Sequence, residues 1–489
     1  MTILLTILGY FVLLLVISRL TSGKTDNDTF YRGNRQSPWY MVAFGMIGAS
    51  ISGVTFVSVP GMVMGIDMTY MQTCLGFILG YAAVAFVLLP VFYRHNLTTI
   101  YSFLQPRLGN RSYTTGASFF LLSKMTGAAA RFYVVCIILQ RFVLDAYGVP
   151  FPLTIVLMVV LIWLYTRRSG IKTLVWTDTL QTLCMFAALI FIIFHVIGML
   201  GWSPTEAMKA VADDPRSRIF VFDDPMSRQY FWKQFLSGIF IVVVMTGLDQ
   251  DMMQKNLTCK TLRDAQKNVM TSSLLFIVVN ILFLCLGAAL LAYADATGFA
   301  LPVGEGGTVV PDKIFPSIAF SLSGFTAVVF VLGMVAAGYS SADGTLTALT
   351  TTFCYNFLKF GQDDQGNQKK ELRIRRIVHV AFALLYLLVI IAFRPFHNES
   401  LIDTLFDIAG FTYGPLLGLY TFGLFTRRQV RDRWVPVIAI VSPVICYILK
   451  INSFQWFGYH FGFEILLLNG LVTFLLLLIA RPRKELLNR

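Results

Sequence analysis

The chain has 489 residues, of which 56% are hydrophobic and 13% are charged, and its mean hydropathy is +0.69. These values exclude a soluble globular protein and indicate a polytopic membrane protein whose partner is the lipid bilayer. The formal net charge is +13. We interpret this charge as a signal of membrane topology, so nucleic acid is not an expected partner.

Thirteen apolar runs have about 20 residues, the length that crosses a bilayer as a helix. They cover residues 1–18, 40–65, 70–93, 115–144, 150–166, 173–200, 235–253, 269–293, 320–357, 376–393, 402–426, 434–450 and 463–480. The first run lacks a basic amino-terminal region and a cleavage site, so we interpret it as a retained span. An odd number of spans places the two termini on opposite sides.

Basic residues indicate which side faces the cytoplasm, because they accumulate in cytoplasmic loops. The first loop holds Arg19 and Arg35, and every second loop after it is similarly basic. The segment 201–234 mixes acids with bases and is expected outside. We therefore predict a multi-pass protein of the cell inner (plasma) membrane, with its amino terminus outside and its carboxy terminus in the cytoplasm.

The second apolar run concentrates small and hydroxyl residues. Gly48, Ser50, Ser52 and Thr55 are followed by Pro60-Gly61. Such a composition is typical of an unwound helix whose free carbonyls line a cavity. Close packing of helices through small residues would also explain the glycines. We favour the broken helix, because packing alone does not require three hydroxyls in six residues.

The fourth run carries Arg131, which lies too far from either end to reach the membrane surface easily. Its planar guanidinium suits a carboxylate. That carboxylate belongs either to a substrate or to the protein, where Asp178 and Asp343 are the candidates, and the sequence leaves both interpretations open.

Acidic residues also occur at the cytoplasmic ends of two runs. Asp178 lies about one turn inside the sixth run, and Asp249, Gln250 and Asp251 end the seventh. These groups form either a gate network or a helix end that faces water.

The ninth run is interrupted by the polar stretch Ala337 to Thr345. Ser340, Asp343 and Thr347 share one helix face, and Ser341 lies on the adjacent stripe. Charged residues at bilayer depth indicate a functional site, and oxygen ligands suit a hard cation. A packing seam is the alternative, but it does not account for Asp343. The chain contains no nucleotide-binding loop and no hydrolase motif, so an enzyme is not expected.

Five segments together resemble the sodium:solute symporter family, whose members carry sugars, proline, vitamins, iodide and sialic acid. They are the Gly48–Gly61 break, the Lys172–Gln181 run with Trp-Thr-Asp, the Gly247–Lys260 run, the Ser340-Ser341 pair and the Ala409–Phe425 run. The resemblance is clearest over residues 39–426. It implies an all-α fold with thirteen transmembrane helices and a LeuT-like core of five plus five inverted helices, some of them discontinuous.

The implied organisation is one transporter domain over residues 1–489. Its parts are a first span with a cytoplasmic loop (1–38), repeat one (39–200), an external loop (201–233), repeat two (234–426) and two last spans with a short cytoplasmic tail (427–489).

The resemblance also implies binding sites. The main Na⁺ site would use the carbonyls of Gly48, Ile51 and Ala337 and the hydroxyls of Ser340 and Ser341. Some members hold a second sodium with the acid of the Trp-Thr-Asp run and with hydroxyls one turn beyond the serine pair. Here Asp178 matches that acid, but Asp343 and Gly344 replace the hydroxyls, so Asp178 and Asp343 form a possible second cation site.

The substrate contacts implied by the resemblance come from three helices: Ser50, Ser52, Thr55, Tyr70, Gln72 and Arg131. Asp249 and Gln250 are candidates for a cytoplasmic gate. Members that carry acidic sugars resemble this chain in placing an arginine on the third core helix, which here carries Arg131.

The expected function is sodium-coupled symport of a small organic anion, such as an acidic sugar or a carboxylate, by a protein that works as a monomer. A sodium-coupled carrier of neutral sugars or amino acids is an alternative. A transporter-like sensor is a second alternative, but the chain ends shortly after its last span, without an output domain.

Overall fold

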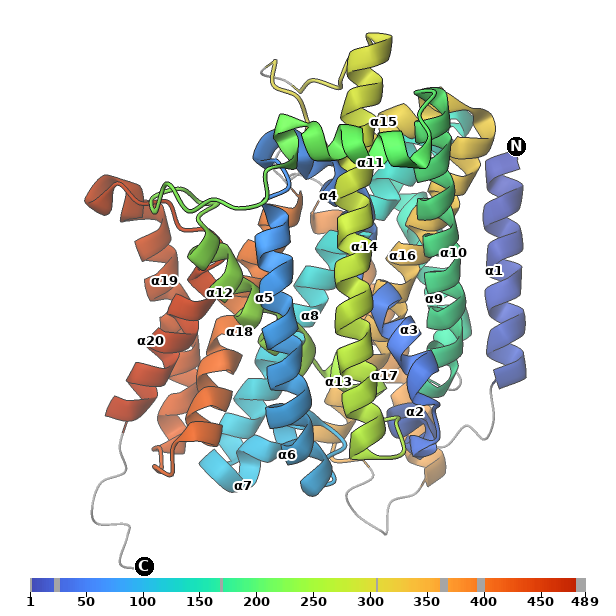
Figure 1. Cartoon of the computed structure of the whole chain (residues 1–489). Helices are drawn as coiled ribbons and strands as arrows, with labels where there is room; N and C mark the ends of the chain where they lie inside the picture. Colours follow the sequence, from blue (N-terminus) through green and yellow to red (C-terminus); the bar gives the residue numbers. More distant parts are fainter. Residues whose placement is uncertain are drawn as a thin grey trace, which may run out of the picture.

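The computed structural model describes residues 2–21, 27–167, 170–304, 307–360, 368–393 and 401–480, with only the backbone for residues 28 and 401–404. Within these ranges the chain is helical, and the helices stand side by side, with α11 lying across one end of the bundle (Figure 1). The carboxy-terminal tail that we assign to the cytoplasm follows Ala480 and lies outside the described residues.

The first ten helices are α1 (Thr2–Thr21), α2 (Asn27–Arg32), α3 (Trp39–Ser50), α4 (Gly53–Ile66), α5 (Tyr70–Ala83), α6 (Leu89–Arg94), α7 (Leu104–Leu108), α8 (Asn110–Leu139), α9 (Phe151–Thr166) and α10 (Ile171–Met199). The next ten are α11 (Pro204–Asp213), α12 (Phe231–Val242), α13 (Gln250–Asn256), α14 (Leu262–Thr297), α15 (Pro311–Leu322), α16 (Gly324–Thr352), α17 (Gln368–Ala392), α18 (Leu401–Phe425), α19 (Val435–Phe457) and α20 (Ile465–Ile479).

Nine helices in the described ranges are long and apolar enough to cross a membrane. Two further spans are bent pairs: α3 and α4 meet at 61°, and α12 with its continuation to Gly247 meets α13 at 70°. Helices α9 and α20 are apolar but shorter. Large apolar side chains such as Leu8 and Leu388, both 61% exposed, face outward from the bundle. The protein is therefore a multi-pass membrane protein.

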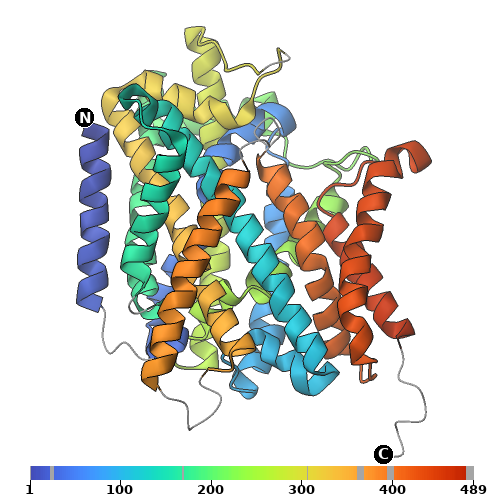
Figure 2. The same cartoon turned by 180° about the vertical axis from the view of Figure 1, so that it is seen from behind.

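The outermost helices of the bundle are α1 at one edge and α19 and α20 at the other, in views from both sides (Figures 1 and 2). Among the long helices in the described ranges, α8, α14, α16 and α18 are the most enclosed. Helix α16 is the most enclosed, because every residue from Gly333 to Thr352 is buried.

The ninth run forms a span as predicted, over Gly324–Phe357, but it starts four residues later than the predicted run. Residues 320–323 lie outside it, because α15 ends at Leu322 and α16 begins at Gly324. Helix α16 is also continuous across its polar stretch. The hydroxyls of Ser341 and Thr345 donate to the carbonyls of Gly338 and Ser341 at 2.9 Å each, so they bond to their own helix without breaking it.

Helices α5 and α12 approach each other through two glycines. A methyl group on Gly76 would lie 2.1 Å from the Phe235 carbonyl oxygen, and one on Gly238 would lie 2.2 Å from the Thr73 carbonyl oxygen. Neither position admits a side chain, so the two backbones are in direct contact.

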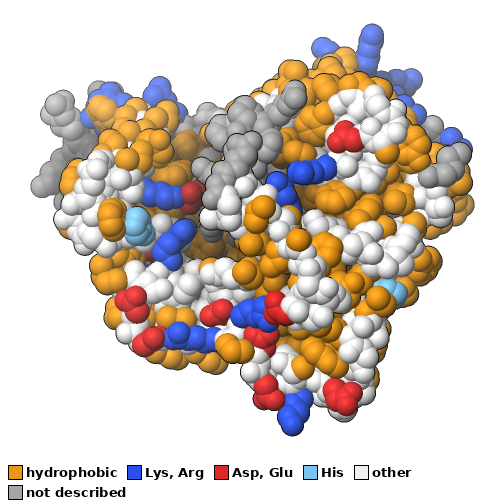
Figure 3. Space-filling model, turned by 90° about the horizontal axis from the view of Figure 1, so that it is seen from above, with side chains coloured by type: hydrophobic (Ala, Val, Ile, Leu, Met, Phe, Trp, Pro, Cys, Tyr) orange, Lys and Arg blue, Asp and Glu red, His pale blue; other side chains and the backbone are white. Residues whose placement is uncertain are grey.

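The segment between α10 and α12, which includes α11, lies at one end of the bundle. On this face, acidic and basic side chains are interspersed (Figure 3). Asp214 accepts hydrogen bonds from Arg216 Nη2 and Nε at 2.8 and 2.9 Å, and Arg216 also reaches Asp295 at 3.1 Å. The hydrogen bonds from Arg216 lower the pKa of Asp214 below its usual value.

Candidate functional site

The helix break predicted in the second run is confirmed, and it lies at Ile51 and Ser52. Both residues have extended backbone between α3 and α4. The Ser52 hydroxyl accepts from the Thr55 N–H at 3.5 Å and so caps α4. The carbonyls of Gly48 and Ile51 accept no hydrogen bond from any described residue. These two predicted ligands are thus buried carbonyl oxygens with free lone pairs.

The serine pair of α16 lies against this break. A methyl group on Gly48 would be 3.2 Å from the Ser340 Oγ, and one on Gly53 would be 3.6 Å from the Gly338 Cα. Ala337, Ser340 and Ser341 are all buried. The structure therefore brings Gly48 at the break against Ser340 of α16, the helix that also carries Ala337 and Ser341. Carbonyl and hydroxyl oxygens are ligands that suit a hard cation. No group of three or more His, Cys, Asp or Glu able to hold a metal occurs among the described residues.

Asp178 and Asp343 are both fully buried but have different partners. Asp178 Oδ1 accepts from the Ser340 hydroxyl at 3.1 Å, and its Oδ2 lies 2.8 Å from the Lys255 Nζ. Asp343 accepts from the Tyr165 hydroxyl at 2.9 Å and from the Gly344 N–H at 2.6 Å. The possible second cation site thus contains a lysine side chain.

Arg131 forms no ion pair with Asp178 or Asp343. The interpretation of Arg131 as half of such an internal pair is therefore wrong, because Lys255 and Tyr165 take those carboxylates. Its half-buried side chain instead lines a cavity of about 100 Å³. The cavity is lined by Ala49, Ser50, Ser52, Thr55, Tyr70, Phe77, Tyr81, Arg131, Ile241, Val242, Met245, Thr246, Met252, Phe276, Leu405 and Phe406.

Five of the six predicted substrate contacts line this cavity, and Gln72 does not. The Gln72 amide donates to the Gln229 carbonyl at 2.8 Å and accepts from the Val221 N–H at 3.1 Å, so it holds the segment before α12. We therefore no longer assign Gln72 to the substrate. Sequence reasoning missed Tyr81 and Thr246, for which the only signal was a polar group inside an apolar run.

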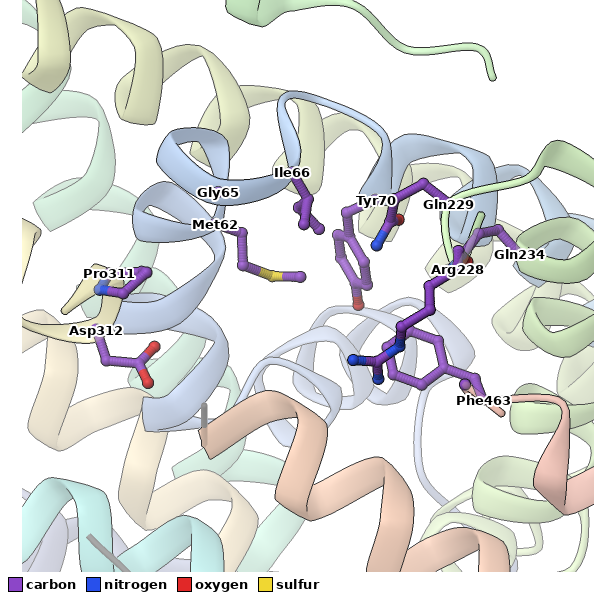
Figure 4. Close-up of a pocket in the computed structure, with 11 residues that line it drawn as sticks. Met62, Gly65, Ile66, Tyr70, Arg228, Gln229, Gln234, Pro311, Asp312 and Phe463 are labelled. Carbon is purple, nitrogen blue, oxygen red and sulfur yellow. The ribbon is translucent and has the colours of Figure 1, made fainter. Parts of the chain in front are cut away.

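Two further cavities adjoin the central one. An outer cavity of about 220 Å³ shares Tyr70 with it, and there Tyr70 and Arg228 point into a space that Asp312 also borders (Figure 4). A small inner cavity of about 20 Å³ shares Arg131 with it and ends at Lys124 and Asp249. The three cavities form a series from the outer end to the middle of the bundle, with Arg131 at the inner junction.

The second broken helix was not predicted as a break. The seventh apolar run of the chain bends at Leu248 and Asp249. There the Asp249 carboxylate accepts hydrogen bonds from the N–H groups of Asp251 and Met252 and so caps α13. Gln250 bonds the Ile100 N–H and the Thr98 carbonyl, both at 3.0 Å. All are buried, so the interpretation of this stretch as a helix end that faces water is wrong.

Five charged side chains form a buried group below the inner cavity, which we name the inner ion network. Its members are Lys124, Asp178, Asp249, Asp251 and Lys255, each at most 5% exposed. Lys124 Nζ lies 3.2 Å from Asp249 Oδ2 and 2.8 Å from Asp251 Oδ2. Tyr413 donates to Asp249 Oδ2 at 2.7 Å. The network joins α8, α10, α13 and α18, and it closes the end of the cavity series.

Sequence reasoning missed the roles of Lys124 and Lys255. A lysine within the fourth run was the available signal, because a charge at bilayer depth needs a partner.

The sequence model of the sodium:solute symporter family matches residues 30–432. The chain is 23% identical to the human sodium/iodide cotransporter, covering 85% of this chain and 65% of that protein. It is 23% identical to a sodium/sialic acid symporter of Proteus mirabilis and 27% identical to one of Aliivibrio fischeri. These matches cover 89% of this chain and 87% and 85% of those proteins.

Solved structures agree with this assignment. A Na⁺-coupled sialic acid symporter in a substrate-bound, outward-open state superposes with a TM-score of 0.83 at 19% identity, covering 98% of this chain and 97% of that one. A nucleobase-cation-symport-1 family transporter in a closed conformation gives 0.57 at 14% identity, covering 94% of each chain. The fold is thus that of LeuT-like transporters, and the protein is a sodium-coupled carrier and not an enzyme. With the family model matching well over half of its length, the chain belongs to the sodium:solute symporter family.

Proposed function

We propose that this symporter takes up a small organic anion, such as an acidic sugar or a carboxylate, together with sodium. The observation that carries the proposal is the position of Arg131, whose guanidinium lines both the central and the inner cavity. It has no ion pair among the described residues, so an anionic substrate would complete it. Sodium-coupled relatives named for iodide, sialic acid and monocarboxylates support an anion.

Substrate in the central cavity would contact hydroxyls as well as Arg131. Ser50, Ser52 and Thr55 come from the first break, and Tyr70 and Thr246 face them. Hydroxyls suit the many oxygens of an acidic sugar. They also suit a neutral sugar or an amino acid, which is the alternative that the experiment below must separate.

We place the coupling sodium at Gly48, Ile51, Ala337, Ser340 and Ser341. Because two of these ligands belong to the first break, a sodium ion there fixes the backbone that also lines the substrate cavity. Sodium and substrate would then each raise the affinity for the other by the same factor. Opening of a gate at Asp249 and Gln250 would release both to the cytoplasm.

The finer topology is part of the proposal. Helices α9 and α20 would add two spans to the eleven and give thirteen. The segments 39–200 and 234–426 each begin with a broken helix, which supports two inverted repeats. We further propose that the protein lies in the plasma membrane with its amino terminus outside, and that it works as a monomer.

The first experiment identifies the substrate. Thermal unfolding of the purified protein is measured with acidic sugars, carboxylates, neutral sugars and amino acids, with and without sodium. A ligand that binds only the folded state stabilises it by an amount that grows with the ratio of its concentration to its Kd. The substrate is therefore the compound whose stabilisation requires sodium.

The second experiment tests the role of Arg131 by sodium-driven uptake into proteoliposomes. Arg131→Ala is expected to lower uptake of the anion about 10- to 100-fold, because it removes a charge-assisted hydrogen bond of about 1.5–3 kcal/mol. Arg141→Ala removes an exposed arginine two residues beyond the end of α8 and should leave uptake unchanged. Unchanged uptake of every carboxylate by Arg131→Ala, with transport of a neutral solute retained, contradicts the anion proposal.

A further inference from the structure

The central cavity has one charged side chain and mainly apolar walls. Among the described residues that line it, Arg131 is the only one with a charge, and nine of the sixteen are Ala, Val, Ile, Leu, Met or Phe. One guanidinium can neutralise one carboxylate. A second carboxylate of the ligand, or the ammonium group of an amino acid, would have no charged partner in this cavity.

Most hydroxyl groups of the cavity already have partners within the protein. The Tyr81 hydroxyl forms hydrogen bonds with Ser50 and Thr246. The Ser52 hydroxyl caps α4. Four of the six hydroxyl-bearing residues that line the cavity are therefore bonded to the protein itself. A hydroxyl that is buried without a hydrogen-bond partner is costly, so the cavity does not favour a ligand with many hydroxyls.

The cavity is also small, and its walls are closely packed. Its volume is about 100 Å³. An apolar cavity of about 150 Å³ holds one benzene molecule, so this space suits a ligand of about six non-hydrogen atoms. The rings of Phe77 and Phe276 pack with their centroids 5.7 Å apart, and the Phe406 ring lies 4.5 Å from that of Phe463. An acidic sugar, with its ring and several substituents, is larger than this space.

One wall of the cavity is rigid. Helix α5 supplies three lining residues, and α12 with its continuation to Gly247 supplies four. These two helices touch through their backbones at Gly76, and again at Gly80, where a methyl group would lie 2.6 Å from the Ile239 carbonyl oxygen. Where backbones are in contact, no change of rotamer can widen the space between the helices. On this side the packing itself therefore limits the size of the ligand.

We propose that the substrate is a short monocarboxylate of about three to five carbons with an apolar tail. Its carboxylate pairs with Arg131, and its tail lies among the apolar side chains of the central cavity, which include Phe77 and Phe276. The proposal rests on the proposed uptake of an organic anion and narrows that anion to one class.

The test measures binding to the purified full-length protein by isothermal titration calorimetry, in sodium chloride and in choline chloride. The ligands are the unbranched monocarboxylates from acetate to octanoate, the acidic sugar glucuronate, and butyramide. We expect the lowest Kd for propionate, butyrate or pentanoate, and binding only with sodium. Butyramide has the shape of butyrate without its charge, so its Kd should be about 10-fold higher or more. Glucuronate should bind more weakly than butyrate.

A variant of the cavity wall tests where the tail lies. Phe276→Ala makes room in the cavity and should move the lowest Kd to a longer chain, hexanoate or octanoate. Phe276→Leu is a milder change in the same direction and serves if Phe276→Ala does not fold. Phe283 lies about two helical turns further along α14 and packs against Phe56, and it does not line the cavity. Phe283→Ala should therefore keep the chain-length preference of the wild type.

The outcomes separate this inference from the proposal on which it rests. The inference is overturned if glucuronate binds at least as tightly as every monocarboxylate, or if no monocarboxylate shows sodium-dependent binding. It is also overturned if the folded Phe276 variants keep the preference of the wild type. Tight binding of glucuronate leaves the organic-anion proposal in place. Sodium-dependent binding of a neutral solute, with no binding of any anion, contradicts the proposed function itself.

Discussion

The two broken helices of this protein differ in chemistry. The first break, at Ile51 and Ser52, has no charged side chain and leaves backbone carbonyls free. The second, at Leu248 and Asp249, is capped by a carboxylate that Lys124 and Tyr413 also hold. A small cation can be bound reversibly by neutral dipoles, whereas buried ion pairs fix a half-helix in position. Changes at the first break should therefore alter sodium binding, and changes at the second should alter stability.

The largest effect is expected from Lys124→Met at the second break. This substitution leaves Asp249 without a cation and Asp251 with only Lys255, 3.6 Å away. It should lower the free energy of unfolding by about 3–5 kcal/mol, equally with and without sodium. The loss is measured by equilibrium unfolding in increasing dodecyl sulfate. Lys124→Met with Asp251→Asn should lose clearly less. If Lys124→Met is as stable as the wild type, the second break is not held by its ion pairs.

A smaller and different effect is expected from Ser341→Ala beside the first break. Loss of one oxygen ligand should raise the sodium concentration for half-maximal stabilisation about tenfold, which corresponds to about 1.4 kcal/mol. Stability without sodium should change by no more than about 0.5 kcal/mol. Thr345→Ala removes a hydroxyl from the same helix that donates to the Ser341 carbonyl, and it should leave the sodium dependence unchanged. Equal sodium dependence in Ser341→Ala and the wild type argues against the proposed ligand set.

The smallest effect is expected from Asp214→Asn, which tests an ion pair away from both breaks. The pKa of Asp214 is lowered in the folded protein. Its pair with Arg216 therefore contributes fully to the free energy of unfolding when the pH is above the ordinary pKa of an aspartate, about 3.9. That contribution disappears as the pH falls through the lower folded value. The pair is partly exposed, so the loss should be at most about 1 kcal/mol.

Thermal unfolding between pH 3 and pH 6 measures this difference. The gap between Asp214→Asn and the wild type should be largest at pH 6 and close on acidification. Asp213→Asn changes an exposed neighbour and serves as the control. A loss as large as that of Lys124→Met would remove the distinction between buried and surface pairs.

The first break was predictable from the sequence because its cause is local. Glycines and hydroxyls replace the long apolar side chains of a span between Gly48 and Thr55, and that change is visible in the residues themselves. The family resemblance then named its partners on α16, and the structure places Ser340 beside Gly48.

The second break was not predictable in the same way. Asp249 and Asp251 at the end of an apolar run have the same pattern whether they face water or lie buried. The difference depends on Lys124, which reaches Asp249 from 125 residues away in the chain. For the same reason the sequence could not decide whether Arg131 pairs with Asp178. That carboxylate is held by Lys255, a contact that only the folded structure shows.

The glycine contact between α5 and α12 has a mechanical consequence. Where Gly76 and Gly238 meet, there are no side chains that could change rotamer while one helix slides along the other. Any relative movement would have to separate two backbones that touch. We therefore expect α5 and the outer half of the second broken helix to travel as one rigid body during the transport cycle, with the sliding surfaces located elsewhere in the bundle.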